Sequence, residues 1–310
     1  ADNYFLWVEA FDPHEPFECP REFLDLYGVV WAGPHYNWSG YEPVEEHSEA
    51  TRHLRRCYAA TLTMNDKWLG KLLDELDSRD GWKDTLVILT TDHGHMLGEH
   101  GCTGKNRWHF WREMGHIPLI VHLPGDAHAR ERRNALTQNI DLLPTILDYF
   151  GLKSPASAHG ESWRPILERD RPAKRKVALY GWFGHTANVT DGRHTYFRAP
   201  AREDNSPLYT HFCVPTTYGQ HDLQGPDVFM KGATLGRFLV HTDCPVLRKR
   251  IRTPRSPAWS DTRLHDVAAD PGETRNLAGT KIEARFLRLL ARALKRADAP
   301  ASQYKRLGVK

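Results

Sequence analysis

The residues with the clearest chemical potential are Asp92 and His93, which directly follow a run of apolar and β-branched residues at 85–91. Such a run, bounded by polar residues and glycine, is typical of a buried strand, and in open α/β sheets ligands bind beyond the carboxyl ends of the strands. An oxygen donor and a nitrogen donor side by side can reach one divalent cation, and Gly94 lets the backbone turn sharply beneath them. The spacing alone fits two structures, a metal site or a capping aspartate followed by a polar loop.

A third candidate is Lys105, which lies in the aromatic-rich stretch GKNRWHFWRE, before a second strand-like run, IPLIVHLPG. The whole pattern TTDHG…LGEHG…K…E…IPLIVHLPG resembles the sulfatase family of the alkaline-phosphatase superfamily. Further segments match in the expected order, including a D-P-H-x-P loop, a D-L-x-P-T-x-L helix and a late D-P-x-E-x-x-N-L motif. The matched segments are 4–27, 56–76, 85–125, 139–152 and 264–279.

The elements that must position these residues alternate between helix and strand. Between 48 and 78, leucines and a tyrosine recur at steps of three and four, which predicts a long amphipathic helix. A second helix is expected over 139–150, with Pro144 near its first turn and Gly151 just after its end. Helix followed by buried strand favours an α/β fold, and the resemblance implies an alkaline-phosphatase-like, mostly parallel sheet flanked by helices.

Composition divides the chain into two parts. Between about 154 and 176 the sequence becomes rich in Pro, Arg, Glu and Ser, which is typical of a boundary. We therefore expect a sulfatase-like α/β domain at 1–170 and a smaller α+β subdomain at 171–310. The second part contains short alternating runs that predict antiparallel strands, and a helix over about 281–297 closes it.

The resemblance assigns roles to the candidate residues. It implies that Asp92 and His93 are metal ligands, and that Lys105 contacts the transferred group and assists the leaving oxygen. It places His14, in the D-P-H-x-P loop, on the leaving-group side, where a histidine can donate a proton near neutral pH. An ordinary loop lysine and a purely structural histidine are the alternatives for Lys105 and His14.

The implied cofactor is a divalent metal ion. Calcium suits an oxygen-rich site, whereas the imidazole of His93 leaves manganese or another transition metal open. The family also carries formylglycine, which forms from the Cys or Ser of an N-terminal C-x-P-x-R or S-x-P-x-R motif. The 310 residues contain no such motif, and the nearest match, beginning at Cys213, lacks the closing arginine. We therefore expect the chain to be the C-terminal two-thirds of a sulfatase-like protein, with the nucleophile upstream.

Several residues are candidates for substrate binding. The aromatic stretch holds His109 and Trp108, which are expected to line the pocket, although tryptophans of this kind also pack in cores. Arg198 and Tyr196 lie in a part of the chain that reaches toward the site entrance in related proteins. His100 and Glu113 are expected to support the lysine loop and not to contact the substrate.

Charge and hydropathy exclude several classes of protein. A net charge of +3 spread along the sequence gives no concentrated footprint for nucleic acid. No stretch approaches the roughly 18 apolar residues of a membrane span. Five cysteines, without the spacing of a metal site, favour reduced thiols and hence a reducing compartment such as the cytoplasm, but they do not determine the location.

These observations favour a metal-dependent sulfuric ester hydrolase, here without its formylglycine nucleophile and inactive alone, that acts on a small-molecule or carbohydrate sulfate ester. One alternative is a phosphonate or phosphate mono- or diester hydrolase of the same superfamily. Another is a non-catalytic fragment or pseudoenzyme that binds an anionic ligand or a partner chain. The expected protein partners are the upstream fragment or further copies of the chain.

Overall fold

The computed structural model describes residues 3–105, 109–169, 174–213, 230–239, 244–251 and 261–309. Its contacts divide the chain into two compact units, Ala1–Arg132 and Arg133–Lys310. This division lies before the boundary that composition suggested at 170/171. The difference has a physical cause, because a buried ion pair and a hydrogen bond join the helical segment after Arg133 to the first strand of the second unit.

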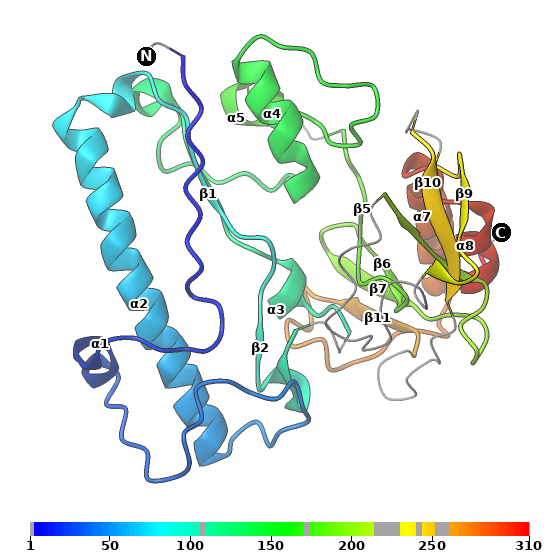
Figure 1. Ribbon diagram of the computed structural model, residues 1–310, viewed down its shortest axis with the longest axis horizontal. Helices are drawn as coiled ribbons and strands as arrows, with labels where there is room; N and C mark the ends of the chain where they lie inside the picture. Colours follow the sequence, from blue (N-terminus) through cyan, green and yellow to red (C-terminus); the bar gives the residue numbers. More distant parts are fainter. Residues whose placement is uncertain are drawn as a thin grey trace. The chain divides into compact units, whose positions relative to one another are not determined.

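The first unit is built around one long helix. Helix α2 (Glu49–Ser78) begins at Ser48, whose side chain accepts a hydrogen bond of 3.1 Å from the backbone N–H of Thr51. Its buried residues follow the helical period and include Leu54, Cys57 and Thr61. These pack against Phe17 and Val29 and form the core of this unit. The predicted amphipathic helix over 48–78 is thus present (Figure 1).

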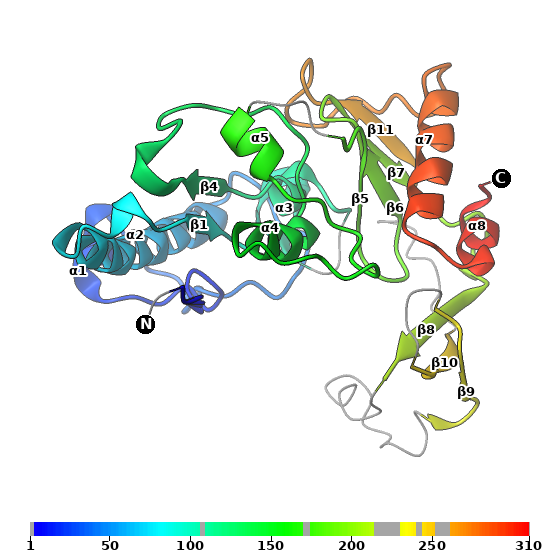
Figure 2. The same cartoon turned by 90° about the horizontal axis from the view of Figure 1, so that it is seen from above.

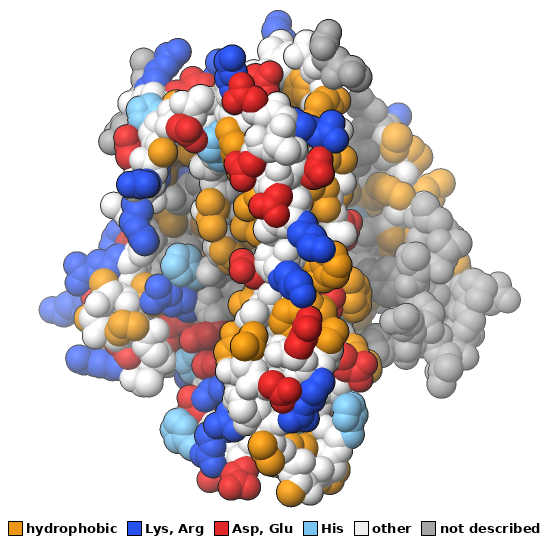
Figure 3. Space-filling model, turned by 90° about the vertical axis from the view of Figure 1, so that its left-hand side faces the viewer, with side chains coloured by type: hydrophobic (Ala, Val, Ile, Leu, Met, Phe, Trp, Pro, Cys, Tyr) orange, Lys and Arg blue, Asp and Glu red, His pale blue; other side chains and the backbone are white. Residues whose placement is uncertain are grey.

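From Leu62 onward, α2 is less well covered. Leu62, Trp68 and Leu72 are 44%, 57% and 38% exposed, respectively. Apolar side chains lie among charged ones on the face of the molecule that Figure 3 presents. Short helices complete the helical part of the unit, namely α1 (Arg21–Leu26), η1 (Gly81–Lys83), η2 (Glu99–Gly101), α3 (Arg112–Gly115) and η3 (Pro124–Asp126).

Two strand pairs lie in this unit. Strand β1 (Val87–Thr90) pairs with β4 (Leu119–His122), and β2 (Met96–Leu97) pairs with β3 (Thr103–Gly104). Both strand-like runs that flank the candidate residues therefore form strands. Their pairing is antiparallel, which corrects the parallel arrangement that we expected between them. The described residues between them form a hairpin and short helical turns, and the chain returns beside β1 in the opposite direction.

The segment at 4–11 precedes the D-P-H-x-P loop and is rich in apolar residues. In the structure it forms no strand, and its apolar side chains are exposed, with Tyr4 at 63%, Trp7 at 62% and Phe11 at 72%. A strand requires hydrogen bonds to a neighbour, and no partner strand for this segment exists among the described residues. The segment at 4–11 therefore has exposed apolar side chains and no strand partner among the described residues.

The second unit contains a four-stranded antiparallel sheet in the order β11-β7-β6-β5 (Figure 2). Helix α7 (Glu283–Arg296) packs on this sheet, and Phe286 and Leu290 meet Val189 and Tyr196 in a fully buried core. The predicted antiparallel strands and closing helix are thus confirmed. The strands are β5 (Ala178–Tyr180), β6 (Ala187–Thr190), β7 (His194–Arg198) and β11 (Arg263–Asp266).

A smaller three-stranded sheet has the order β8-β10-β9 and is also antiparallel. Helix α8 (Ala301–Leu307) contacts β8. The strands are β8 (Leu208–Phe212), β9 (Thr234–Gly236) and β10 (Val246–Ile251). The helical segment of this unit comprises η4 (Asn139–Asp141), α4 (Leu142–Tyr149) and α5 (Arg164–Arg169).

Asp141 anchors this helical segment. Its carboxylate, 1% exposed, forms a two-pronged ion pair with Arg175, in which one contact measures 2.6 Å. It also accepts hydrogen bonds from the backbone N–H of Gln138 at 2.8 Å and of Glu161 at 2.9 Å. The side chain of Gln138 donates to the carbonyl oxygen of Leu179 in β5 at 2.9 Å. The Asp141 ion pair thus ties the start of α4 to the segment just before β5, and the Gln138 hydrogen bond reaches β5 itself.

Candidate active site

The loop that holds His14 is fixed at both ends. Asn65 of α2 donates a hydrogen bond of 2.9 Å to the carbonyl oxygen of Asp12. After the loop, the backbone N–H of Phe17 donates to the carbonyl oxygen of Asn37 at 2.8 Å, and the Phe17 ring is buried in the core. Two prolines inside the loop further restrict its backbone. His14 therefore projects from a rigid support.

Lys105 and His14, which are 91 residues apart in the sequence, meet in the structure. The Lys105 ammonium lies 2.5 Å from Nε2 of His14. Lys105 is 7% exposed, so its charge is largely withdrawn from water. The two residues to which the resemblance gave catalytic roles are thus brought together, as a shared site requires.

A third residue, Glu15, lies between them, and sequence reasoning had not selected it. Its carboxylate is 2% exposed and lies 3.5 Å from the Lys105 ammonium, 3.5 Å from Nδ1 of His14 and 3.6 Å from Nε2 of His95. The Tyr41 hydroxyl donates a hydrogen bond to its other oxygen. A buried carboxylate is stable only when it is paired and hydrogen-bonded, and Glu15 meets both conditions.

These contacts set the charges of the cluster. Burial by itself would raise the pKa of Glu15, but the hydrogen bond from Tyr41 and the nearby His95 and Lys105 outweigh it, so the pKa is lowered. Burial lowers the pKa of His95 to about 4, although Glu15 acts in the opposite direction. Burial and Glu15 raise the pKa of Tyr41. At neutral pH the cluster therefore combines an ionised Glu15 with a neutral His95 and a neutral Tyr41.

Gly104 is the position that allows Tyr41 and Lys105 to approach each other. It has a φ of +92°, and a Cβ there would lie 2.2 Å from the Tyr41 ring. The preceding residue, Thr103, donates its backbone N–H to the carbonyl oxygen of Glu42 at 3.1 Å. The short strand β3 thus holds the segment after Tyr41 against the start of the lysine loop, and only glycine fits at the crossing.

Asp92 and His93 follow β1, as predicted. The backbone N–H of His93 donates to Oδ1 of Asp92 at 2.9 Å, and Nδ1 of His93 lies 2.7 Å from the carbonyl oxygen of Gly94. Nε2 of His93 lies 3.5 Å from Oδ2 of Asp92. Metal–ligand bonds are about 2.0–2.6 Å long, so one cation can reach both atoms. The two side chains therefore fit as part of a metal site.

Gly94 is required for this turn. Its N–H donates to the carbonyl oxygen of Met114 at 3.0 Å, and a Cβ at this position would lie 1.8 Å from the carbonyl oxygen of Glu113. His95, two residues after His93, lies with its Nε2 3.6 Å from the Glu15 carboxylate, so the candidate metal ligands are close in the chain to a residue of the Glu15 cluster. The pair Asp92–His93 and the cluster around Glu15 are thus neighbours in one unit.

The predicted substrate-binding residues have packing roles in the structure. His109 is 2% exposed and packs edge-to-face on Trp111, with ring centroids 5.2 Å apart. Arg198 donates from Nε to the carbonyl oxygen of Leu307 at 2.9 Å, which joins β7 to the end of α8. Trp108 lies outside the described residues. Substrate contact by these three residues stays a prediction.

His100 and Glu113 lie close together, and their support of the lysine loop stays a prediction. The His100 ring stacks on Trp111, with centroids 4.0 Å apart, and its Nε2 lies 3.6 Å from a carboxylate oxygen of Glu113. Tyr196, a substrate-binding candidate in the sequence, is buried and donates its hydroxyl hydrogen to Glu283 at 2.9 Å. Of the cluster residues that sequence reasoning missed, Glu15 carried one signal, an acidic residue enclosed between His14 and Pro16.

Comparison with known families identifies the chain. Residues 2–152 match the model of the sulfatase family, and residues 98–213 match the model described as N-sulphoglucosamine sulphohydrolase, C-terminal. The chain belongs to the sulfatase family of the alkaline-phosphatase superfamily. The expected family is therefore confirmed.

Individual relatives of this sulfatase-family chain agree with the family models. It is 30% identical over 178 residues to the multifunctional alkaline phosphatase superfamily protein PehA of Trinickia caryophylli, covering 53% of this chain and 33% of the relative. It is 34% identical over 142 residues to an N-acetylglucosamine-6-O-sulfatase of Bacteroides thetaiotaomicron, covering 45% of this chain and 25% of the relative. The chain therefore spans about a third or less of the length of these relatives.

Solved structures support the fold. A phosphonate monoester hydrolase of Agrobacterium radiobacter superposes with a TM-score of 0.59 at 19% identity, covering 93% of this chain and 55% of the other. The expected alkaline-phosphatase-like α/β fold is thus confirmed. In the part of the sulfatase-family chain that the structure describes, no helix combines the length and the apolar character that crossing a membrane requires.

Proposed function

We propose that the protein containing this chain is a metal-dependent sulfuric ester hydrolase. The observation that carries the proposal is the contact between Lys105 and His14 over the buried carboxylate of Glu15, close to the pair Asp92–His93. Hydrolysis of a sulfate ester develops negative charge on the sulfuryl oxygens and on the departing alkoxide. A site for this reaction needs fixed cations and a proton donor, and the chain offers both.

Each residue has a distinct task in this proposal. The Lys105 ammonium stabilises the oxygens of the transferred group. When His14 is an imidazolium and its Nε2 carries a hydrogen instead of accepting one from Lys105, it delivers that proton to the leaving oxygen and returns to the neutral form. Glu15 holds both side chains in place, because it contacts Nζ of Lys105 and Nδ1 of His14 at the same distance of 3.5 Å. The Lys105 ammonium has three hydrogens; one faces Glu15 and one faces Nε2 of His14, so one remains for the substrate.

Asp92 and His93 would hold the divalent metal ion, which supplies charge stabilisation as a Lewis acid. Calcium is the first choice for an oxygen-rich site, and the imidazole keeps manganese or another transition metal as alternatives. The covalent nucleophile would be a formylglycine outside these 310 residues. These assignments extend the family resemblance to the positions Asp92 and His93 of this chain.

The proposed substrate is a sulfate ester of a carbohydrate. This proposal draws on the relative named N-acetylglucosamine-6-O-sulfatase, to which 45% of the chain is similar. A phosphonate or phosphate ester hydrolase is a second candidate, since the fold is shared with a phosphonate monoester hydrolase. Both candidates use the same cations, because sulfuryl and phosphoryl groups are tetrahedral anions of similar size.

The test uses the natural protein that contains this chain, assayed on matched aryl sulfate and aryl phosphonate esters. We expect faster turnover of the sulfate, and Lys105→Ala should lower that rate by about 10²–10³, the typical cost of one charge-stabilising contact. Lys67→Ala is the matched control, because Lys67 is a half-exposed lysine of α2 that pairs with Glu22. Equal rates for Lys105→Ala and the unaltered protein would refute the proposed site, and faster phosphonate turnover would favour the second candidate.

A further inference from the structure

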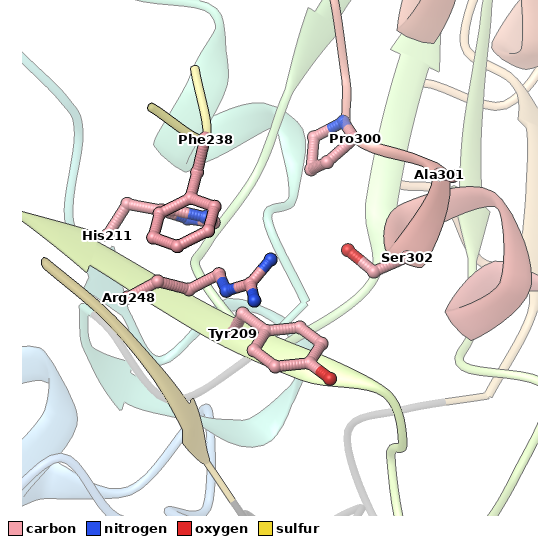
Figure 4. A pocket seen from close by; sticks show the side chains of 7 residues that line it. All are labelled: Tyr209, His211, Phe238, Arg248, Pro300, Ala301 and Ser302. Carbon is pink, nitrogen blue, oxygen red and sulfur yellow. The ribbon is translucent and has the colours of Figure 1, made fainter. Parts of the chain in front are cut away.

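A separate pocket lies in the second unit, between the three-stranded sheet and the start of α8 (Figure 4). Its volume is about 300 Å³. This size is at the lower end of the range of small-molecule sites, which suits a ligand of about one ring. Its lining residues are Tyr209, His211, Phe238, Arg248, Pro300, Ala301 and Ser302.

Arg248 is the only charged residue among those lining residues. Its guanidinium carbon lies 3.8 Å from the centroid of the Phe238 ring and 5.1 Å from that of Tyr209. Figure 4 shows the guanidinium between these two rings, with the Ser302 side chain across the open space. The two rings hold the guanidinium group, so its N–H edge is what the pocket can present to a ligand.

Two features of the fold place Phe238 and His211 beside Arg248. Phe238 follows β9 and turns back over the sheet, and a Cβ at Gly236 would lie 2.7 Å from its ring. His211 is the cross-strand partner of Arg248 in the pair β8–β10. Glycine at 236 and the strand register therefore bring one aromatic ring and one imidazole to the same cation.

Among the residues that line the pocket, Arg248 carries the one formal charge. In the ranges that the structure describes, no carboxylate pairs with Arg248. Burial and the charge of Arg248 lower the pKa of His211, so that this imidazole is neutral at pH 7 and acts as a hydrogen-bonding group. A guanidinium with stacked faces and no acidic partner is suited to an oxyanion, which it can bind through two parallel hydrogen bonds.

We propose that this pocket binds a single oxyanion group, a carboxylate or a sulfate, carried on a small ring such as that of an anionic sugar. Arg248 contacts the anion, and His211 and Ser302 offer further hydrogen bonds. The apolar atoms of Tyr209 and Pro300 cover the ring. The site uses residues of the second unit alone and does not depend on the hydrolase reaction proposed above.

The experiment titrates the natural protein with glucuronate, glucose 6-sulfate, inorganic sulfate and neutral glucose. Binding is followed by the ¹⁵N–¹H resonance of the Arg248 side chain, which is assigned by its loss in Arg248→Lys. We expect both anionic sugars to shift this resonance in a saturable way and glucose to leave it unchanged. Inorganic sulfate should bind more weakly than glucose 6-sulfate, because it lacks the ring.

Three variants test whether the ligand binds at this pocket and not elsewhere on the protein. By calorimetry, Arg248→Lys should weaken binding of glucuronate about tenfold or more, because an ammonium cannot form the paired hydrogen bonds. Arg250→Lys is the matched control, since it makes the same change two residues along β10 outside the pocket lining. Lys105→Ala should leave the Arg248 shift intact, so failure of the hydrolase proposal would not affect this one. An unmoved Arg248 resonance with both anionic sugars, or equal affinities for Arg248→Lys and Arg250→Lys, would overturn the proposal.

Discussion

At the scale of single residues, the candidate site contains one carboxylate that determines the surroundings of several other groups. Glu15 is almost fully buried, and it contacts four side chains, those of Lys105, His14, His95 and Tyr41. Ionised carboxylates are rarely buried unless they are paired. We interpret Glu15 as a positioning residue, which acts on the reaction through Lys105 and His14.

Glu15→Gln tests this interpretation. The amide retains the shape of the side chain but loses the charge that orients Lys105, and a misplaced catalytic group can cost about 10²-fold in rate. We expect kcat to fall by that order, while affinity for inorganic sulfate is maintained or rises, because a negative charge leaves the site. A purely structural residue would instead weaken both and lower the melting temperature. Glu18→Gln is the control, since Glu18 lies three residues further along the chain with its side chain 64% exposed.

His93→Ala and Lys105→Ala should differ in metal content. His93 is proposed to coordinate the ion, so its removal should lower both metal occupancy and rate. Lys105 is proposed to contact only the transferred group, so its removal should lower the rate alone. Metal analysis of the purified variants beside their kinetics measures both effects. Full metal occupancy in His93→Ala would contradict the proposed ligand.

At the scale of secondary-structure elements, two glycines differ in what surrounds them. Gly94 lies after β1, and a Cβ there would come within 1.8 Å of the carbonyl oxygen of Glu113, whereas a Cβ at Gly70 in α2 would meet no atom within 4 Å. Gly94→Ala should therefore destabilise the protein by about 1–3 kcal/mol through overpacking. Gly70→Ala should stabilise it by about 0.5–1 kcal/mol, because alanine favours the helix. Chemical denaturation measures the change in the free energy of unfolding for both variants. If both variants were more stable than the unaltered protein, the backbone contact at Gly94 would be unimportant.

The ion pair between Asp141 and Arg175 joins α4 to the sheet of the second unit. Asp141→Asn leaves Arg175 buried without its partner and should cost about 3–5 kcal/mol of folding free energy. Asp148→Asn is the control, because its pair with Arg164 is about 40% exposed, and such surface pairs contribute about 0–1 kcal/mol. Thermal unfolding of both variants measures how much folding free energy each one loses. A loss no larger for Asp141→Asn than for Asp148→Asn would refute the anchoring role.

At the scale of the whole molecule, the sequence predicted the parts whose signals are local. The helical period of residues 48–78, the apolar runs around Asp92 and His93, and the closing helix near 281–297 all correspond to observed elements. Strand pairing depends on contacts between distant residues, so the antiparallel pair β1–β4 could not be deduced from either run alone. For the same reason Glu15 was missed, because its partners Tyr41, His95 and Lys105 meet only in three dimensions.

The first unit has exposed apolar surface. Leu6 and Trp7, with 64% and 62% exposure, lie in a segment without strand partners among the described residues, and Ile120 in β4 is 62% exposed. Unpaired extended segments and contiguous apolar surface promote association. We therefore expect the 310-residue chain, expressed alone, to form aggregates, and the double change Leu6→Gln with Trp7→Gln to reduce them. The matched control is Leu62→Gln with Leu72→Gln on α2, where the helix already satisfies the backbone. Light scattering measures the effect, and a monodisperse unaltered chain with cooperative unfolding would show that this surface does not drive association.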